Sequence, residues 1–104
     1  MQQYKLKRGF KPDIDRIYSV MKECFPGEIS RDAGVLETSY GAMSKIKVWI
    51  DNKRLFVDTV SDKTVTDDEI ILQTNKVFRD FLYKATGYTA KERVKMAKKD
   101  VGGD

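Results

Sequence analysis

Histidine is absent from this sequence of 104 residues, and cysteine occurs once, at Cys24. The lack of histidine removes the commonest general base, the commonest metal ligand and every histidine-based catalytic triad. A single cysteine excludes an internal disulfide framework and, within a monomer, a metal site made of thiolates. It also favours a reducing compartment, so we expect the protein to be cytoplasmic.

Long apolar runs are also missing. No N-terminal segment has the apolar core of a signal peptide, and no segment approaches the roughly 18 apolar residues that suggest a membrane span. Glycine-rich phosphate loops of the Walker or GxGxxG type do not occur. Cys24 lies on the apolar stripe of a predicted helix, where an inert buried thiol is a simpler interpretation than a nucleophile. We therefore expect no cofactor, no metal, no membrane association and no enzymatic activity.

Charge is what the chain has in abundance. Charged residues make up 35% of it and hydrophobic residues 40%, with a net charge of +4. These values are typical of one soluble domain with a modest core, which we place at residues 1–101, followed by a frayed tail at 102–104. Basic residues concentrate in residues 1–12 and 91–99. Such ends favour either simple solubility or contacts with phosphates and other anions.

Hydrophobic periodicity divides the chain into eight elements. Five segments alternate in polarity or are rich in strand-forming residues, and three carry an apolar stripe at helical spacing. In chain order we predict a strand at 4–8, a helix at 13–24, strands at 28–31, 35–40, 45–51 and 54–60, and helices at 67–86 and 89–100. Turn residues predict tight turns at 32–34 and at Asn52-Lys53.

Two capping-box patterns mark the starts of the last two helices. Thr66 opens the first, which Glu69 closes, and Thr89 opens the second, which Glu92 closes. Gly87 stands where a helix ends in a left-handed residue. The spacing of a calcium-binding loop is missing. The sequence also contains an acidic cluster of Asp62, Asp67, Asp68 and Glu69. The positive end of a helix explains this cluster better than a divalent-metal site does.

The order β-α-β-β-β-β-α-α, with its hairpins, predicts an α+β fold. We expect an antiparallel sheet of four or five strands with the helices packed on one face. The apolar stripes of the helices and one face of the sheet form the predicted core, which comprises Leu6, Ile14, Ile17, Met21, Ile46, Val48, Ile50, Leu55, Val57, Ile71, Val77, Phe78, Phe81 and Leu82.

The hairpin KIKVWIDNKRLFVD, residues 45–58, has an unusual second face. Its expected register pairs Ile50 with Leu55 and Val48 with Val57 on the core side. On the other side Trp49 meets Phe56, and Lys47 meets Asp58. The only tryptophan of the chain is thus expected on the face turned toward water, among basic residues and few acids.

Aromatic rings that alternate with cations are typical of sheet faces that bind single-stranded nucleic acid, because bases stack on rings and cations meet phosphates. Lys5 and Lys7 extend this face if the first strand joins the sheet with Leu6 inward. The predicted nucleic-acid-binding residues are Lys45, Lys47, Trp49, Arg54 and Phe56 of the hairpin and Lys91, Lys95, Lys98 and Lys99 of the last helix.

Three other interpretations of this face stay open. Trp49 and Phe56 are also explained by a simple cross-strand aromatic pair. The last helix or the N-terminal arm could cover them. Alternatively, the face is a protein-interaction or homodimerisation surface without a nucleic-acid role, since exposed aromatic patches often mark interfaces.

The element order resembles the repeat of the TATA-box-binding protein family, with one additional C-terminal helix. That resemblance implies a fold only, because no nucleic-acid-contacting motif of the family is present and a single repeat forms a saddle only as a dimer. The segments YKLKRG, KVWIDNKRLFVD and TGYTAKERVKMAKK also resemble a family of small, basic, uncharacterised archaeal proteins. This second resemblance likewise implies a fold and no activity.

Overall fold

The computed structural model describes the backbone of residues 2–102 and the side chains of residues 2–96. The elements are β1 (Gln2–Lys5), α1 (Ile14–Cys24), β2 (Ser30–Asp32), β3 (Val35–Tyr40), β4 (Met43–Asp51), β5 (Arg54–Ser61), α2 (Asp68–Thr86) and α3 (Ala90–Gly102). The predicted α+β class and element order are confirmed. The helix α3 includes Gly102, the first residue of the tail expected to fray, and the rest of that tail lies outside the described residues.

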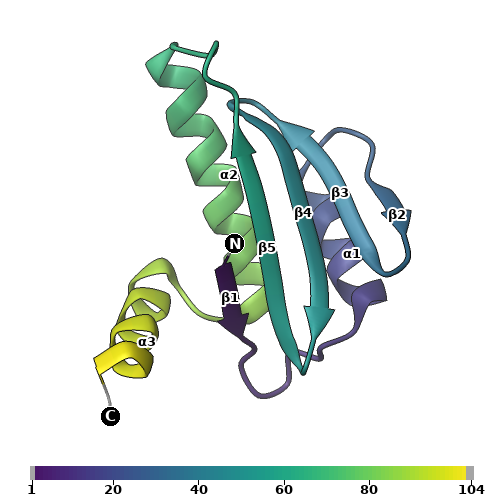
Figure 1. Cartoon of the computed structure of the whole chain (residues 1–104), viewed down its shortest axis with the longest axis vertical. Helices are drawn as coiled ribbons and strands as arrows, with labels where there is room; N and C mark the ends of the chain where they lie inside the picture. The colour runs from purple at the N-terminus through teal and green to yellow at the C-terminus, as the bar shows by residue number, and fades with distance from the viewer. Residues whose placement is uncertain (1, 103–104) are drawn as a thin grey trace.

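The five strands form one sheet in the order β1-β5-β4-β3-β2, and every neighbouring pair is antiparallel. Figure 1 shows α1 and α2 on one face of this sheet and α3 beside the edge strand β1. No described helix lies over the opposite face, which we call the outer face. The sheet therefore has one covered side and one open side, as an antiparallel sheet can.

Local sequence signals set the ends of α1 and α2, with one correction. Asp13 caps α1 by accepting a hydrogen bond from the amide of Asp15. The cap of α2 is Asp67, whose Oδ1 accepts from the Glu69 and Ile70 amides, so the prediction of Thr66 is wrong by one residue. Both residue types cap well, and the aspartate adds a negative charge at the positive helix end.

Gly87 ends α2 in the predicted left-handed conformation, with a φ of 82°. Its amide donates to the carbonyl of Tyr83. A Cβ at this position would lie 2.7 Å from Cε1 of Phe10, so the close approach of that ring also requires glycine. The second predicted capping box is confirmed by the reciprocal hydrogen bonds between Thr89 and Glu92.

The β4–β5 hairpin has the register that the sequence predicts. Ile50 pairs with Leu55, Val48 with Val57, Trp49 with Phe56 and Lys47 with Asp58. Asn52 and Lys53 both have positive φ values, of 51° and 62°, which a two-residue turn of the primed type requires.

The first two strands differ from their predicted bounds. The strand expected at 4–8 is β1, Gln2–Lys5, because the chain leaves β5 after Lys5 and the Lys7 amide donates instead to the carbonyl of Thr86. The strand expected at 28–31 is β2, Ser30–Asp32, since its pairing partners in β3 begin after the turn at Ala33 and Gly34.

The core lies between the sheet and the helices α1 and α2. Eight predicted residues are buried: Ile17, Met21, Ile46, Val48, Leu55, Val57, Phe81 and Leu82. Phe25 and Leu36 are also fully buried, although the sequence did not single them out. Phe25 caps the end of α1, and its ring lies 5.5 Å from that of Phe81. The predicted members that are only partly buried are Leu6, Ile14, Ile50, Ile71, Val77 and Phe78.

Candidate nucleic-acid interface

Two aromatic rings occupy the middle of the outer face. Trp49 of β4 and Phe56 of β5 are directly paired, and their rings stack with centroids 5.7 Å apart and an interplanar angle of 10°. Both side chains are half-buried. Since β1 pairs with β5 as an edge strand and α3 lies beside it, neither described element covers the rings (Figure 1).

The first strand adds to this face in part. Gln3 pairs with Phe56 and Lys5 pairs with Arg54, so both side chains project on the same side as their partners. Lys7 does not join them, because its Nζ lies 5.9 Å from the centroid of the Tyr88 ring. The expected contribution of the first strand is therefore limited to Lys5.

Acidic residues are more numerous on the outer face than the sequence predicted. Oε1 of Glu37 lies 4.0 Å from Nζ of Lys47, whose β5 partner is Asp58. Asp51 pairs with Arg54 across the hairpin. The sequence led us to expect few acids here, with Asp58 as the chief exception, and it does not reveal that β3 also brings Glu37 beside Lys47. Aromatic rings, rather than excess positive charge, distinguish the hairpin.

The basic residues of the last helix lie apart from the hairpin. Lys91 and Lys95 are exposed on α3, which flanks β1, while Lys45 and Lys47 are two strands further into the sheet. The predicted residues Lys98 and Lys99 belong to α3, but their side chains lie outside the described part of the chain. The structure thus divides the seven predicted residues whose side chains it describes between two surfaces separated by β1.

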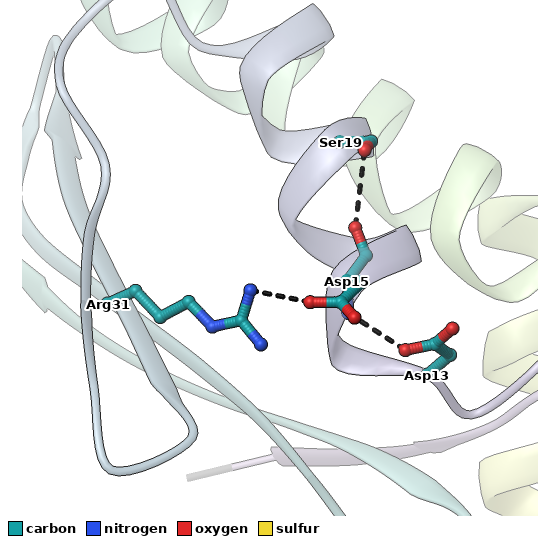
Figure 2. A network of polar contacts seen from close by, with 4 residues as sticks. All are labelled: Asp13, Asp15, Ser19 and Arg31. Atoms are coloured by element: carbon teal, nitrogen blue, oxygen red, sulfur yellow. Dashed lines mark hydrogen bonds and ion pairs between the residues drawn. The ribbon is translucent and has the colours of Figure 1, made fainter.

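Arg31 is a cation that the sequence left without a role. Its Nη1 lies 2.6 Å from Oδ1 of Asp15, so β2 is tied to the first turn of α1 (Figure 2). Its guanidinium also lies 6.0 Å from the centroid of the Tyr18 ring. Because Arg31 projects on the helix side of the sheet, it stabilises the packing of α1 and does not extend the outer face.

Potential metal ligands do not cluster in the part of the chain that the structure describes. Within it, no three histidine, cysteine, aspartate or glutamate side chains gather closely enough to hold a metal ion. Cys24 is half-buried, and burial raises the pKa of its thiol. Oδ1 of Asp62 accepts hydrogen bonds from the amide and the hydroxyl of Thr64 in the turn before α2, and these bonds lower the pKa of the carboxyl. None of the three helices, as described, combines the length and apolar character needed to cross a membrane.

One concavity was missed by reasoning from the sequence. A groove of about 440 Å³ lies between β1, α2 and α3. The side chains that line it include Tyr4, Phe78, Arg79 and Arg93. No local sequence signal could identify this groove, because β1, which forms one wall, is more than 70 residues away in the sequence from the parts of α2 and α3 that form the others.

Fold and outer face together define a small α+β protein with one antiparallel sheet, two helices on one face and aromatic and basic side chains on the other. The chain belongs to a family described as a domain of unknown function, DUF5611, whose model matches residues 1–99. It is also similar to the hypothetical protein TA0095 from Thermoplasma acidophilum, known from an NMR solution structure. The two share 32% sequence identity and a TM-score of 0.70, and the match covers 96% of this chain and 100% of that chain.

These findings agree with the resemblance to a family of small archaeal proteins. The description of the family and the name of the similar protein state no activity. No match to this chain was found among curated proteins. Any function must therefore reside in the side chains that the fold presents on its surface.

Proposed function

We propose that this protein is a binding module whose outer sheet face contacts nucleic acid. The observation that carries the proposal is the stacked pair of Trp49 and Phe56 on a face that no described helix covers. The pair is flanked by Lys45, Lys47 and Arg54 on the same two strands. A half-buried aromatic platform that no described helix covers suits bases of any sequence, since every base has a face that can stack.

Stacking contributes more than net charge to binding at the hairpin. A base stacked on an aromatic side chain gains about 1–3 kcal/mol. The nearby carboxylates of Glu37, Asp51 and Asp58 offset part of the attraction between the cations and phosphates. The basic residues of α3 supply additional sequence-independent phosphate contacts, through Lys91, Lys95, Lys98 and Lys99.

The test is an NMR titration of labelled protein with single-stranded and duplex oligonucleotides. Amides of Trp49 and Phe56 should shift on addition of single strands, and Trp49 fluorescence should be quenched at low salt and recover on addition of salt. A labelled oligonucleotide should bind Trp49→Ala more weakly than the wild type. Tyr83→Ala is the matched control, because Tyr83 is an exposed aromatic residue on α2. Unchanged fluorescence and unshifted hairpin amides at all oligonucleotide concentrations would reject the proposal.

A protein-interaction or homodimerisation module is the competing function. The same uncovered pair, Trp49 and Phe56, favours it, because exposed aromatic patches are common at protein interfaces. In that case Trp49→Ala would lower the mass measured by sedimentation and leave oligonucleotide titrations flat. We also propose kinship with the TATA-box-binding protein repeat, which the element order supports; a dimer would then form the two-repeat saddle.

The remaining parts of the proposal concern chemistry and cellular compartment. We propose that the protein acts without enzymatic activity, metal or cofactor, and that it works in the cytoplasm. The lack of histidine and the raised pKa of the half-buried Cys24 thiol support the first part. The single cysteine supports the second. Stoichiometric zinc in the purified protein, or a turnover that Cys24→Ala abolishes, would contradict the proposed absence of metal and of enzymatic activity.

A further inference from the structure

The groove between β1, α2 and α3 combines an apolar wall with two cations. Phe78 and Leu82 of α2, Val94 of α3 and Tyr4 of β1 form its apolar surface, and Arg79 and Arg93 also line it. Val94 is 56% exposed, so the wall on the α3 side is open to water. A volume of about 440 Å³ is within the range of small-molecule sites.

Both guanidinium groups line the same groove. Nη1 of Arg93 donates to the carbonyl of Tyr88 at 2.6 Å, and its guanidinium lies 6.0 Å from the centroid of the Tyr4 ring. Arg79 makes one hydrogen bond, from Nε to the carbonyl of Asn75 at 3.3 Å. The pKa of Arg93 is lowered mainly by burial, and the nearby charge of Arg79 acts in the same direction.

Neither cation is neutralised within the described part of the chain. Three ion pairs of the described residues join Arg31 to Asp15, Lys47 to Glu37 and Lys84 to Glu23, and these three include neither Arg79 nor Arg93. Each guanidinium has five N–H donors, and the hydrogen bonds above use one donor of each. Two like charges at an apolar wall are unfavourable by themselves, so their placement suits an anion with two negative charges.

We propose that this groove binds the phosphate monoester of a nucleotide, with the phosphate held by Arg79 and Arg93 and the base against Phe78 and Leu82. A phosphate monoester carries a charge of about −1.5 to −2 at neutral pH and offers three acceptor oxygens, which matches a pair of guanidinium forks. A carboxylate supplies only one charge. A planar base fits the apolar wall, where a free inorganic anion would gain nothing.

This site goes beyond the outer face, because its residues belong to β1, α2 and α3 and none of them is in the hairpin. The same chemistry is available from two sources, a free mononucleotide and the phosphorylated 5′ end of a strand. Both present a monoester phosphate next to a base, so the experiment includes an arm for each.

The test is an NMR titration with adenosine 5′-monophosphate, with adenosine and inorganic phosphate in parallel. Adenosine monophosphate should shift the amides of Tyr4, Phe78, Arg79 and Arg93, while adenosine or phosphate alone binds far more weakly. Arg79→Gln should weaken binding by about tenfold or more, as expected for the loss of a charge-assisted hydrogen bond. Lys76→Gln is the matched control, because Lys76 is an exposed cation of α2 outside the groove.

Arg79→Gln is the decisive variant because Arg79 makes only one local hydrogen bond, whereas Arg93 also anchors α3 and its loss could displace that helix. A 5′-phosphorylated tetranucleotide that binds the groove more tightly than adenosine monophosphate identifies a strand end as the source. The reverse order identifies a free nucleotide.

The inference is overturned if none of these monoesters shifts the groove amides, if adenosine binds as well as its monophosphate, or if Arg79→Gln binds like the wild type. The chemical-shift map separates this failure from that of the proposed function. Oligonucleotides that shift Trp49 and Phe56 while the groove amides stay unmoved would leave the outer face as the binding surface and reject the groove.

Discussion

Nη2 of Arg16 donates a hydrogen bond of 2.7 Å to the carbonyl oxygen of Ala85, which joins α1 to the last turn of α2. The same side chain donates from Nε to the carbonyl of Lys11 at 2.9 Å and lies 5.6 Å from the centroid of the Phe10 ring. A half-buried cation thus satisfies a carbonyl at the negative end of a helix, where positive charge is favourable.

Replacement of Arg16 by methionine should therefore destabilise the fold. Methionine keeps much of the apolar length and removes the charged hydrogen bonds, so we expect a loss of about 1.5–3 kcal/mol in the free energy of unfolding. Urea denaturation followed by circular dichroism measures it. Lys76→Met, at an exposed position of α2, is the control and should change the stability by less than about 0.5 kcal/mol. Equal effects of the two variants would contradict this role of Arg16.

Phe81 and Phe78 should differ in their importance to stability, although the sequence predicts both in the core. Phe81 is fully buried and packs 5.5 Å from the Phe25 ring, whereas Phe78 is half-buried beside the groove. Phe81→Ala should cost about 3–5 kcal/mol because it leaves a cavity. Phe78→Ala should cost clearly less in the same denaturation experiment. A larger loss for Phe78→Ala would show that the burial of these two rings is assigned incorrectly.

Gly41 should not tolerate a side chain. It has a φ of 53°, and an added Cβ would overlap Oγ1 of Thr74, which accepts from the Ala42 amide at 2.9 Å and donates to the Ile70 carbonyl. Gly41→Ala combines backbone strain, overpacking and loss of these hydrogen bonds, for an expected cost of about 2–4 kcal/mol.

Gly34→Ala is a matched control for that substitution. Gly34 also has a positive φ, of 82°, but an added Cβ would meet nothing within 4 Å. Gly34→Ala should lower the free energy of unfolding only by the cost of placing alanine in a left-handed conformation, about 1 kcal/mol. Thermal or urea unfolding measures this loss. If both variants lose the same stability, the contact between Gly41 and Thr74 contributes nothing.

Stability should fall in alkaline solution in part because of Tyr4. Burial raises the pKa of its hydroxyl above the usual value of 10.0, and the charge of Arg93 offsets this only in part. As pH rises past 10.0, the unfolded chain loses this proton before the folded chain does. The contribution of the Tyr4 hydroxyl to the free energy of unfolding is therefore fully present below that pH and is lost progressively above it.

Tyr4→Phe should remove this part of the pH dependence. The difference in unfolding free energy between about pH 8 and about pH 11 should be smaller in the variant than in the wild type. Urea titrations at the two pH values measure it, and Tyr83→Phe, at an exposed position, serves as the control. A pH dependence that is identical in Tyr4→Phe and the wild type would contradict the prediction.

Nucleic-acid binding should depend on salt mainly through α3. Lys91→Gln or Lys95→Gln should each reduce the slope of log affinity against log salt by about 0.7 for a single strand. Lys47→Gln should change the slope less, because Glu37 already offsets its charge. Trp49→Ala should weaken binding at every salt concentration and leave the slope unchanged. Anisotropy titrations of a labelled oligonucleotide measure all four, and a steep slope that depends on Lys47 would contradict this division.

The sequence alone determined the elements whose formation depends on neighbouring residues. Alternating polarity and the two-residue turn at Asn52-Lys53 specify the register of the β4–β5 hairpin, so the pairing of Trp49 with Phe56 was predictable. The boundary at Gly87 and the capping box of Thr89 and Glu92 also follow from interactions within a few residues.

The tertiary structure decided which distant segments meet. The position of Glu37 beside Lys47 depends on the β3–β4 register, which shifts between Thr38 and Tyr40 and which no short turn specifies. Phe25 is buried because tertiary packing brings Phe81 of α2 and Tyr40 of β3 against it. The placement of Arg79 and Arg93 in one groove likewise requires β1, α2 and α3 to be packed together, because burial of the common core, and not local sequence pattern, brings remote segments together.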